Sequence, residues 1–347
     1  MKILLAALFA AACMAAVSSP SSGLPGGPGS SDQTPEQAGA PAPLASHGRP
    51  GQRAGGRALV RAAIRLIAIV AATLILVSAL LLLFERRLIY FPTRDPEFSW
   101  QPPGLKVEEC AFRTQDGLQL YGWWHPGRGD DDPARRPVLL WCHGNAGNIS
   151  HRAENLSLLA DHGIAVMIFD YRGYGKSEGT PSEDGLYLDA SAAYEYLIDA
   201  RRIEPARIIC FGRSLGAAVA LHLALEKKCA GLILESPFAS MRAMARHRLP
   251  FPPAWLFMRS RFDNLDLIRR VTVPVFVVHG DRDELVPFEQ GREVFDAAPE
   301  PKQFYVIHGA GHNDTYVVGG ADYFRAVRAF CESCLSRAGS PGPSAAN

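Results

Sequence analysis

From Val138 onward, short apolar runs alternate with amphipathic stretches, and this alternation limits the fold more than any other feature of the sequence. Strands that alternate with helices form a parallel sheet covered by helices on both faces. Two earlier runs, 107–113 and 118–124, indicate an antiparallel hairpin at the edge of that sheet. We therefore expect an α/β fold with a mostly parallel central sheet. The expected later strands are 138–142, 165–170, 207–211, 231–235, 275–279 and 303–307, and the expected helices are 150–162, 184–201, 215–225, 288–298 and 321–336.

Residues 66–84 are nineteen consecutive residues without a charge, rich in Leu, Ile, Val and Ala. At about 1.5 Å per residue, a helix of this length spans the roughly 30 Å hydrocarbon core of a bilayer. A buried helix of a soluble domain is the alternative, but such helices usually keep a polar face. Only Thr73 and Ser78 interrupt this run. The segment therefore predicts a transmembrane helix and a membrane as a partner.

Three further segments flank this helix and the globular region that follows it. Residues 1–18 begin with a basic start and continue in an uncharged apolar run, which is typical of a signal peptide. Residues 19–56 are mostly Ser, Gly, Pro and Ala, cannot bury enough apolar surface to offset chain entropy, and are expected to be disordered. We expect one globular domain over 85–336 and a disordered tail over 337–347.

The arginines around the apolar helix carry information on its orientation. More of them precede the helix than follow it, which favours a cytoplasmic N-terminus and a large domain outside the cytoplasm. A cleaved signal peptide would instead return the domain to the cytoplasm, unless translation starts near the arginine cluster or the first segment stays uncleaved. From the arginine bias we expect an extracytoplasmic domain. The Arg-, Ala- and Gly-rich composition is typical of a GC-rich bacterial genome, so the membrane is expected to be a bacterial inner membrane. The arginines are Arg49, Arg53, Arg57, Arg61 and Arg65 before the helix, and Arg86, Arg87 and Arg94 after it.

Charge and cysteine usage exclude several classes of function. Lys+Arg 36 against Asp+Glu 35 leave a formal net charge of +1, so the chain lacks the basic surplus typical of nucleic-acid partners. Seven cysteines in a chain of this length do not indicate a disulfide framework. Cys331 and Cys334 lack the second ligand pair that a structural zinc needs. We expect no nucleic acid, no metal and no cofactor.

The pattern Gly-x-Ser-x-Gly occurs twice, around Ser177 and around Ser214. Ser214 follows the apolar strand 208–211 directly and precedes an apolar helix directly, so it lies in a tight strand-to-helix turn. Flanking glycines allow a strained backbone there, and the helix N-terminus favours developing negative charge. Ser177 has neither flank and is interpreted as a loop serine. Ser214 is the expected nucleophile.

A serine hydroxyl needs a base, and the base needs an acid that orients it, in the chain order Ser, Asp, His. A strand ends near residue 279 and runs into a loop that carries Asp281, Asp283 and Glu284, which supplies candidates for the acid. His312 lies in a loop between a glycine and a polar pair, where a base can reach the nucleophile. His308, at the end of a strand, is interpreted as a packed histidine.

An oxyanion hole requires two backbone N–H groups that converge on one point. The N–H group of Leu215, directly after the nucleophile, is one expected donor. The other should come from the loop after the first parallel strand, residues 143–148, where glycine lets the backbone approach a substrate. The backbone N–H group of Asn145 is the expected second donor.

With these motifs in this order, the sequence resembles the α/β-hydrolase fold family. Within it, the likeness is strongest to membrane-anchored serine hydrolases that include the eukaryotic α/β-hydrolase-domain protein depalmitoylases. The resemblance extends over about residues 83–335. It depends on residues 85–92 after the apolar helix, the 143–148 loop, residues 169–175, 212–216 and 235–238, and residues 279–287 together with His312.

The resemblance also implies which acid serves the histidine. In the family it is the fifth residue of His-Gly-x-x-Asp, which is Asp283 here, with Asp281 in reserve. Glu235 also ends a strand, but its segment is interpreted as structural. Asp170 resembles the family's structural aspartate.

These residues predict acyl transfer to Ser214, followed by hydrolysis of the acyl-enzyme by water that His312 activates. Residues 241–263 contain an apolar, proline-broken stretch, 249–258, which is either a short cap over the pocket or a loop packed on the sheet edge. An apolar cap on a membrane-tethered body favours a lipid-like acyl chain in an ester or thioester. The resemblance implies the same, because some family members remove palmitate from protein cysteines.

Two other functions stay open at this stage. Similar sequences often carry a serine-aminopeptidase label, so a peptidase or amidase is the alternative enzyme, although such peptidases usually need a larger cap. The alternative from another class is a catalytically dead hydrolase that serves as a membrane-bound scaffold.

Overall fold

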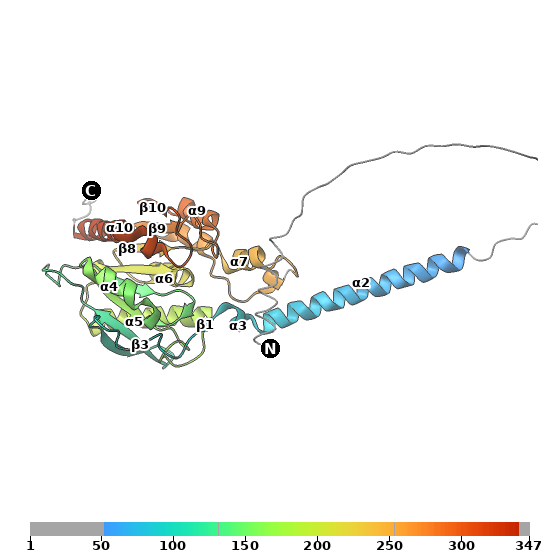
Figure 1. Cartoon of the computed structure of the whole chain (residues 1–347), viewed down its shortest axis with the longest axis horizontal. Coiled ribbons are helices and arrows are strands. Elements are labelled where there is room, and N and C mark those ends of the chain that lie inside the picture. Colours follow the sequence, from blue (N-terminus) through green and yellow to red (C-terminus); the bar gives the residue numbers. More distant parts are fainter. Residues whose placement is uncertain (1–51, 131, 253, 340–347) are drawn as a thin grey trace, which may run out of the picture. The chain divides into compact units, whose positions relative to one another are not determined.

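An eight-stranded sheet forms the centre of the computed structural model, which describes residues 52–130, 132–252 and 254–339 (Figure 1). The strands lie in the order β10-β9-β8-β7-β4-β6-β3-β2. β3 is antiparallel to β2 and to β6, and the other neighbouring strands are parallel. The strands are β2 (Glu108–Arg113), β3 (Gln119–His125), β4 (Val138–Cys142), β6 (Ala165–Phe169), β7 (Ile208–Arg213), β8 (Gly231–Glu235), β9 (Val275–Gly280) and β10 (Lys302–Ile307).

Helices cover the sheet on both faces because the side chains of its central strands alternate between two apolar cores. In β4, Leu140 and Cys142 belong to one core, and Leu139 and Trp141 to the other. The first core takes in α5 (Glu183–Asp199), α6 (Leu215–Glu226) and α9 (Phe288–Ala297). The second takes in α4 (Ala153–Asp161), which follows the short helix η1 (Ile149–Arg152), and α10 (Thr315–Gly339).

The expected fold class is confirmed, and the expected strands of the sheet agree with the observed ones to within two residues at each end. The C-terminal helix differs more. It begins at Thr315 rather than at residue 321 and contains a non-helical residue, Gly320, at φ 49°. The expected helix began only after Gly319-Gly320, because glycines usually interrupt a helical pattern. In the structure, one turn of helix precedes the break at Gly320. Residues 337–339, expected in a disordered tail, continue α10, and 340–347 lie outside the described residues.

The N-terminal apolar helix is α2 (Gln52–Leu83), longer than the expected 66–84. Its first residues are rich in Arg and Ala, which are strong helix formers, and the expectation considered hydropathy alone. The helical residues 52–56 therefore correct the end of the expected 19–56 linker. The rest of that linker and the expected 1–18 signal segment lie outside the described residues.

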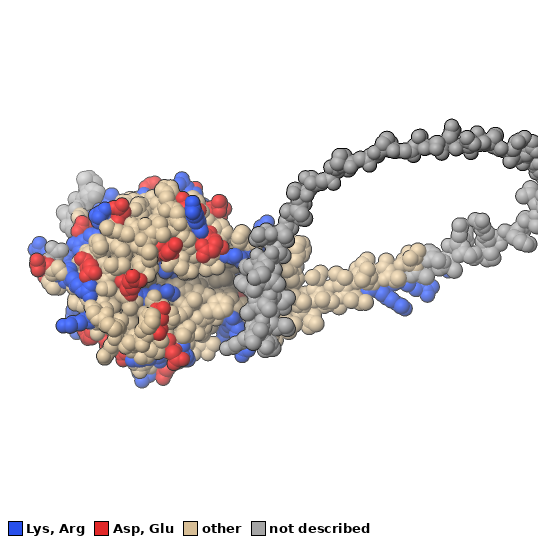
Figure 2. All heavy atoms as spheres, viewed as in Figure 1, with Lys and Arg blue, Asp and Glu red and all other residues tan. Residues whose placement is uncertain are grey.

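The stretch Leu59–Leu83 of α2 has the length and apolar character to cross a membrane, a test that signal sequences also pass. Its arginine side chains gather at the N-terminal end of the helix (Figure 2). The chain divides into two compact units, Met1–Val60 and Arg61–Asn347, and the contacts described below lie within the second.

Two short elements that the sequence analysis did not expect follow α2. α3 (Glu85–Ile89) is a single turn and a half, and β1 (Phe91–Pro92) pairs in parallel with β5 (Ala146–Gly147). The segment between β8 and β9 is also irregular. It consists of α7 (Met241–Arg248), η3 (Ala254–Phe257), α8 (Asn264–Leu267) and η4 (Ile268–Arg270), and another short turn, η2 (Pro205–Arg207), precedes β7.

Candidate active site

Ser214 lies in the turn between β7 and α6 with a backbone φ of 54° and ψ of −117°. Such a φ costs a residue with a side chain about 1–3 kcal/mol, and the surrounding glycines explain how the turn tolerates it. A Cβ atom on Gly212 would lie 2.1 Å from the carbonyl oxygen of Gly216, and one on Gly216 would lie 1.9 Å from that of Cys142. Only glycine fits at either position. The two glycines therefore allow the tight turn that places Ser214 at the N-terminus of α6.

Asp283 and His312 lie in the turns that follow the neighbouring parallel strands β9 and β10. The Nδ1 atom of His312 is 2.8 Å from Oδ2 of Asp283, and both side chains are buried, with 5% and 0% exposed. The Oδ1 atom of Asp283 accepts hydrogen bonds from the backbone N–H groups of Leu285 (2.9 Å) and Val286 (2.8 Å). The carboxylate therefore has no freedom to turn away from the histidine.

His279 is a second histidine on the same carboxylate, and the sequence analysis gave it no role. Its Nε2 atom lies 3.3 Å from Oδ2 of Asp283 and 3.2 Å from the carbonyl oxygen of Val286. Because both neighbours are acceptors, Nε2 carries the proton. Burial disfavours the charged carboxylate, but the hydrogen bonds from His279 and His312 outweigh it and hold the pKa of Asp283 well below its usual value. The His-Gly-x-x-Asp spacing contained this signal.

The reserve candidates Asp281 and His308 lie close to this pair and contact each other instead. The Nδ1 atom of His308 is 2.8 Å from Oδ2 of Asp281, whose other oxygen accepts from the N–H group of Gly309 at 2.7 Å. The hydrogen bond from His308 lowers the pKa of Asp281. The His308 side chain is 84% exposed, so the interpretation of His308 as a packed histidine is wrong. It stands at the end of β10, where the strand leaves the sheet.

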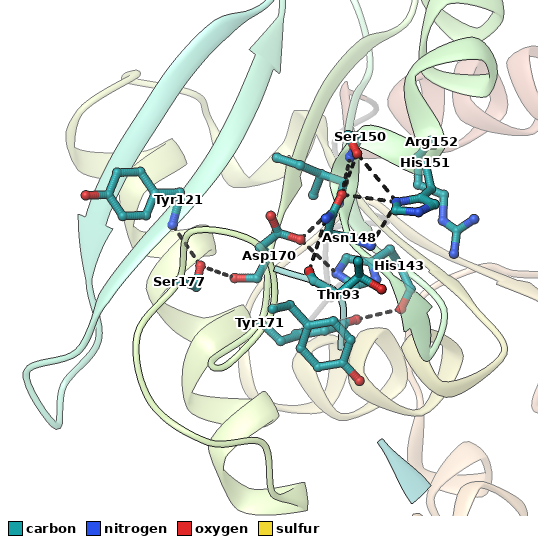
Figure 3. A network of polar contacts seen from close by, with 12 residues as sticks. Thr93, Tyr121, His143, Asn148, Ser150, His151, Arg152, Asp170, Tyr171 and Ser177 are labelled. Atoms are coloured by element: carbon teal, nitrogen blue, oxygen red, sulfur yellow. Dashed lines mark hydrogen bonds and ion pairs between the residues drawn. The ribbon is translucent and has the colours of Figure 1, made fainter. Parts of the chain in front are cut away.

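The other candidate serine, Ser177, is fully buried and both its hydrogen-bonding functions are occupied. Its hydroxyl donates to the carbonyl oxygen of Asp170 (2.7 Å) and accepts from the N–H group of Tyr121 (3.0 Å), as Figure 3 shows. A serine held in this way ties the loop after β6 to β3. Its geometry is that of a structural residue.

A buried ionic cluster lies behind the turn that carries His312. Arg213, directly before Ser214, donates from Nη2 to the carbonyl oxygen of His312 and lies 3.2 Å through Nε from Oε1 of Glu235. Glu235 also accepts hydrogen bonds from Thr315 (2.5 Å) and Tyr323 (2.7 Å). The cluster thus connects the nucleophile turn to the histidine turn. Sequence reasoning interpreted Glu235 as structural but did not identify Arg213 as its partner.

The 143–148 loop is supported from below by a buried network around Asp170 (Figure 3). Oδ1 of Asp170 accepts from the N–H group of Ile149 at 2.9 Å and lies 3.6 Å from Nε2 of His143. Burial raises the pKa of Asp170 to about 8 and lowers that of His143 to about 3, so both side chains are neutral near pH 7. Asn148 donates to the carbonyl oxygens of Thr93 (3.1 Å) and Asp95 (2.7 Å).

Asn145 connects the loop to the segment that follows α2. Its side-chain amide donates to the carbonyl oxygen of Ile89, and its side-chain oxygen accepts from the hydroxyl of Tyr174 at 3.0 Å. β1 pairs with β5 directly beside it. With the side chain held, the backbone of Asn145 is fixed at the carboxyl end of β4. The N–H group of Leu215, the first residue of α6, has no acceptor within the helix.

The described residues contain no candidate metal site, and the cysteine pair near the C-terminus is buried. Within the part of the chain that the structure describes, His, Cys, Asp and Glu residues form no group of three that could hold a metal ion. Cys331 and Cys334 are free and buried in α10, and burial raises the pKa values of both thiols.

Comparisons with known proteins identify related sequences and a related fold. Residues 133–266 match the family described as serine aminopeptidase, S33. An uncharacterised protein of Mycobacterium tuberculosis is 40% identical over 246 residues, which cover 71% of this chain and 86% of the relative. The α/β-hydrolase domain-containing protein WAV2 of Arabidopsis thaliana is 33% identical and covers 73% of this chain and 89% of its own. The esterase Pf2001 of Pyrococcus furiosus superposes with a TM-score of 0.58 at 25% identity, over 71% of this chain and 99% of that structure.

Proposed function

Because this chain belongs to the α/β-hydrolase-fold serine hydrolases, we propose that it is a membrane-anchored serine hydrolase that cleaves esters or thioesters of lipid-like acyl chains. Ser214, His312 and Asp283 act as nucleophile, base and acid. The backbone N–H groups of Leu215 and Asn145 form the oxyanion hole. No cofactor or metal takes part.

In the proposed reaction, Oγ of Ser214 attacks the acyl carbonyl carbon and passes its proton to Nε2 of His312. Asp283 holds the opposite nitrogen, Nδ1, in its protonated form and stabilises the imidazolium that results. The negative charge on the substrate oxygen is stabilised by the N–H groups of Leu215 and Asn145 and by the N-terminus of α6. His312 then protonates the leaving group. Water, activated by the same histidine, hydrolyses the acyl-enzyme.

One observation carries this proposal: the buried hydrogen bond between Asp283 and His312, whose turn is joined through Arg213 to the strained turn of Ser214. Arg213 precedes Ser214 in the chain and bonds the carbonyl group of His312, so the nucleophile turn and the base belong to one rigid cluster. A strained serine that served only packing would be replaced at little cost by glycine, which adopts φ 54° freely. The combination favours catalysis over a structural role.

A fluorophosphonate probe tests the proposal directly, because it reacts with serines that a base has activated. Membranes that carry the wild-type chain should be labelled, and those that carry Ser214→Ala should not. Ser177→Ala is the matched control from the second Gly-x-Ser-x-Gly pattern and should be labelled like the wild type, per folded molecule. Absence of labelling on the folded wild-type chain would contradict the proposal and favour the scaffold function.

The family description as a serine aminopeptidase supports a second candidate, a peptidase or amidase. The two are separated by their leaving groups. Turnover of p-nitrophenyl acyl esters and acyl thioesters, compared with aminoacyl amides of equal acyl size, should favour the esters and thioesters. The segment between β8 and β9 offers four short helices as a cap, which suits a single acyl chain better than a peptide.

We further propose that α2 anchors the enzyme in a bacterial inner membrane, with the catalytic domain on the extracytoplasmic side. The apolar stretch Leu59–Leu83 and the excess of arginine before it support this arrangement. Protease added to intact spheroplasts should then degrade the domain over 85–336. Protection of the domain would place it in the cytoplasm.

A further inference from the structure

Three large apolar side chains stand exposed in the segment between β8 and β9. Phe251, Leu256 and Phe257 are 79%, 50% and 68% exposed, and we call them the apolar tip. Large apolar side chains that gather outside a core mark a surface that contacts another body. Leu256 and Phe257 lie in η3 and Phe251 precedes it, so the tip does not belong to the sheet or its covering helices.

Basic residues surround the apolar tip without acidic neighbours in the chain. Residues 241–261 contain five arginines and one histidine but no Asp or Glu. The guanidinium group of Arg246 lies 5.8 Å from the ring centre of Trp255, and Arg259 and Arg261 are exposed. Exposed aromatic and apolar side chains beside arginines are typical of segments that lie in the headgroup region of a bilayer.

The structure ties this segment to the end of the apolar helix. The carboxylate of Glu85 accepts hydrogen bonds from the backbone N–H groups of Arg259 (3.1 Å) and Ser260 (2.7 Å), and its side chain is buried. Figure 1 shows α7 and α3 at the same end of the domain. Glu85 stands two residues after Leu83, the last residue of α2.

The lengths involved bring the tip within reach of a membrane. Two residues span at most about 7 Å of extended chain, both from Leu83 to Glu85 and from Arg259 to Phe257. A headgroup region extends several Å beyond the hydrocarbon core on each side. If α2 crosses a bilayer, Phe257 therefore cannot lie far from the surface of that bilayer.

A hollow beside Glu85 and Arg259 combines apolar and positively charged walls, as a lipid with an anionic headgroup requires. It has a volume of about 630 Å³ and lies between the end of α2, α3 and the start of α5. Leu83 gives it an apolar wall, and Arg86, Arg87 and Arg259 give it positive charge. Asp184 also lines it, whereas the carboxylate of Glu183 already accepts from the backbone of residues 261 and 262.

We infer that the apolar tip is a second membrane contact, which enters the lipid at the surface of the bilayer that α2 spans. The inference rests on the proposed membrane anchor. A lipid surface is favoured over a protein partner because Arg259 and Ser260, which closely follow Phe257, donate hydrogen bonds to Glu85, just after the end of α2. The surrounding arginines favour anionic lipid headgroups. In this position the segment between β8 and β9 would lie where lipid-linked acyl groups enter and leave the bilayer.

Site-directed photo-crosslinking tests this inference in the full-length chain. p-Benzoylphenylalanine is placed at Phe257, at Leu74 within α2, or at Arg135, and each protein is reconstituted in vesicles of phosphatidylethanolamine and phosphatidylglycerol. Arg135 is the matched control, because its side chain is 90% exposed. It precedes β4 and so lies at the amino ends of the parallel strands, whereas the Ser214 turn lies at their carboxyl ends. After irradiation, mass spectrometry measures lipid adducts on each peptide, and fluorophosphonate labelling verifies folding.

We expect lipid adducts at Leu74 and at Phe257, the latter at least about fivefold above those at Arg135. Adducts at Leu74 with only the Arg135 level at Phe257 would overturn the second contact and leave the anchor intact. Absence of adducts at Leu74 would overturn the anchor and this inference with it. Irradiation of intact membranes that links Phe257 to a protein rather than to lipid would replace the lipid surface with a protein partner.

The arginines provide an independent measurement. Arg246→Gln, Arg259→Gln and Arg261→Gln, combined in one chain, should lower lipid adducts at Phe257 in vesicles that contain phosphatidylglycerol. The same variant should match the wild-type chain in vesicles of phosphatidylcholine alone. Equal adduct levels in both kinds of vesicle for both proteins would overturn the role of anionic lipid.

Discussion

Two Asp–His pairs lie between the same two turns of this domain, and only one of them is enclosed. In each, a histidine Nδ1 atom is 2.8 Å from an aspartate Oδ2 atom. The side chains of His312 and Asp283 are 5% and 0% exposed, whereas those of His308 and Asp281 are 84% and 35% exposed. Hydrogen-bond length therefore does not distinguish a candidate site from a surface ion pair.

The difference lies in what surrounds the two carboxylates. Asp283 accepts from two backbone N–H groups and from His279 as well as His312, so water has no place to compete. Asp281 accepts from one backbone N–H group and is open to solvent. An enclosed pair can hold an imidazole in one orientation and one tautomer, while solvent screens the attraction within an exposed pair.

Replacement of each aspartate by asparagine should separate the two pairs by the largest difference in activity. Asp283→Asn should lower the turnover of a short acyl ester by about 10³–10⁴-fold, because an amide nitrogen beside Nδ1 favours the wrong imidazole tautomer. Asp281→Asn should stay within about twofold, as expected for a surface pair. Steady-state kinetics on the two purified variants, with thermal unfolding as a check of folding, measures both. Similar losses from both variants would show that burial does not select the acid.

The cluster behind His312 offers a smaller test of what holds the enclosed pair. Arg213→Gln alone would leave the buried carboxylate of Glu235 without its partner and risk unfolding. The paired variant Arg213→Gln with Glu235→Gln removes both charges and keeps side chains of similar size. Without the bond to its carbonyl group, His312 should shift, and kcat should fall by about 10–100-fold with little change in KM. An unchanged kcat in a folded protein would show that the turn keeps its position without Arg213.

The two Gly-x-Ser-x-Gly patterns should also differ in how much their serines contribute to the free energy of unfolding. Ser177→Ala leaves the carbonyl group of Asp170 and the N–H group of Tyr121 without their buried partner, which should lower the free energy of unfolding by about 1–3 kcal/mol. Ser214→Ala keeps the strained turn and should change it by less than about 0.5 kcal/mol. Denaturant unfolding in detergent, followed by tryptophan fluorescence, measures both. A larger loss for Ser214→Ala would contradict the structural role of Ser177.

The sequence predicted the centre of the sheet well because β4, β6, β7, β8 and β9 are buried along their whole length, so each is an apolar run. It separated Ser214 from Ser177 by their flanks, since a strand and a helix that meet directly at a serine leave room only for a tight turn. The pairing of Asp283 with His312 agrees with the chain order and with the family resemblance. The assignment of catalytic roles to these residues stays a prediction.

Several features could not be predicted from the sequence because they depend on tertiary contacts or on very short elements. The burial of His308 could not be judged, because a histidine at a strand end can point into the core or into solvent. Arg213 and Glu235 are 22 positions apart and become partners only because β7 and β8 are neighbours in parallel register. The start of α2 was missed because hydropathy does not report the helix propensity of Arg and Ala. α3 and β1 are too short to produce a periodic pattern, although they support the Asn145 loop.

The smallest expected difference between the two pairs is in the pH dependence of stability, and it tests the ionisation of Asp283 directly. The pKa of Asp283 in the folded state lies well below the value of about 3.9 in an unfolded chain. Below the folded-state pKa both states bind the proton, and between the two values the unfolded state binds more, so stability rises with pH across that window and is complete above about pH 5. As pH falls from 5 towards 2, wild-type stability should therefore drop more steeply than that of Asp283→Asn, and the gap between them should narrow. Asp281→Asn should follow the wild-type curve, because an exposed carboxylate gains little from its partner. Denaturant midpoints measured at several pH values for all three proteins test this, and a constant gap between wild type and Asp283→Asn would mean that the enclosed carboxylate is not held ionised by its two histidines.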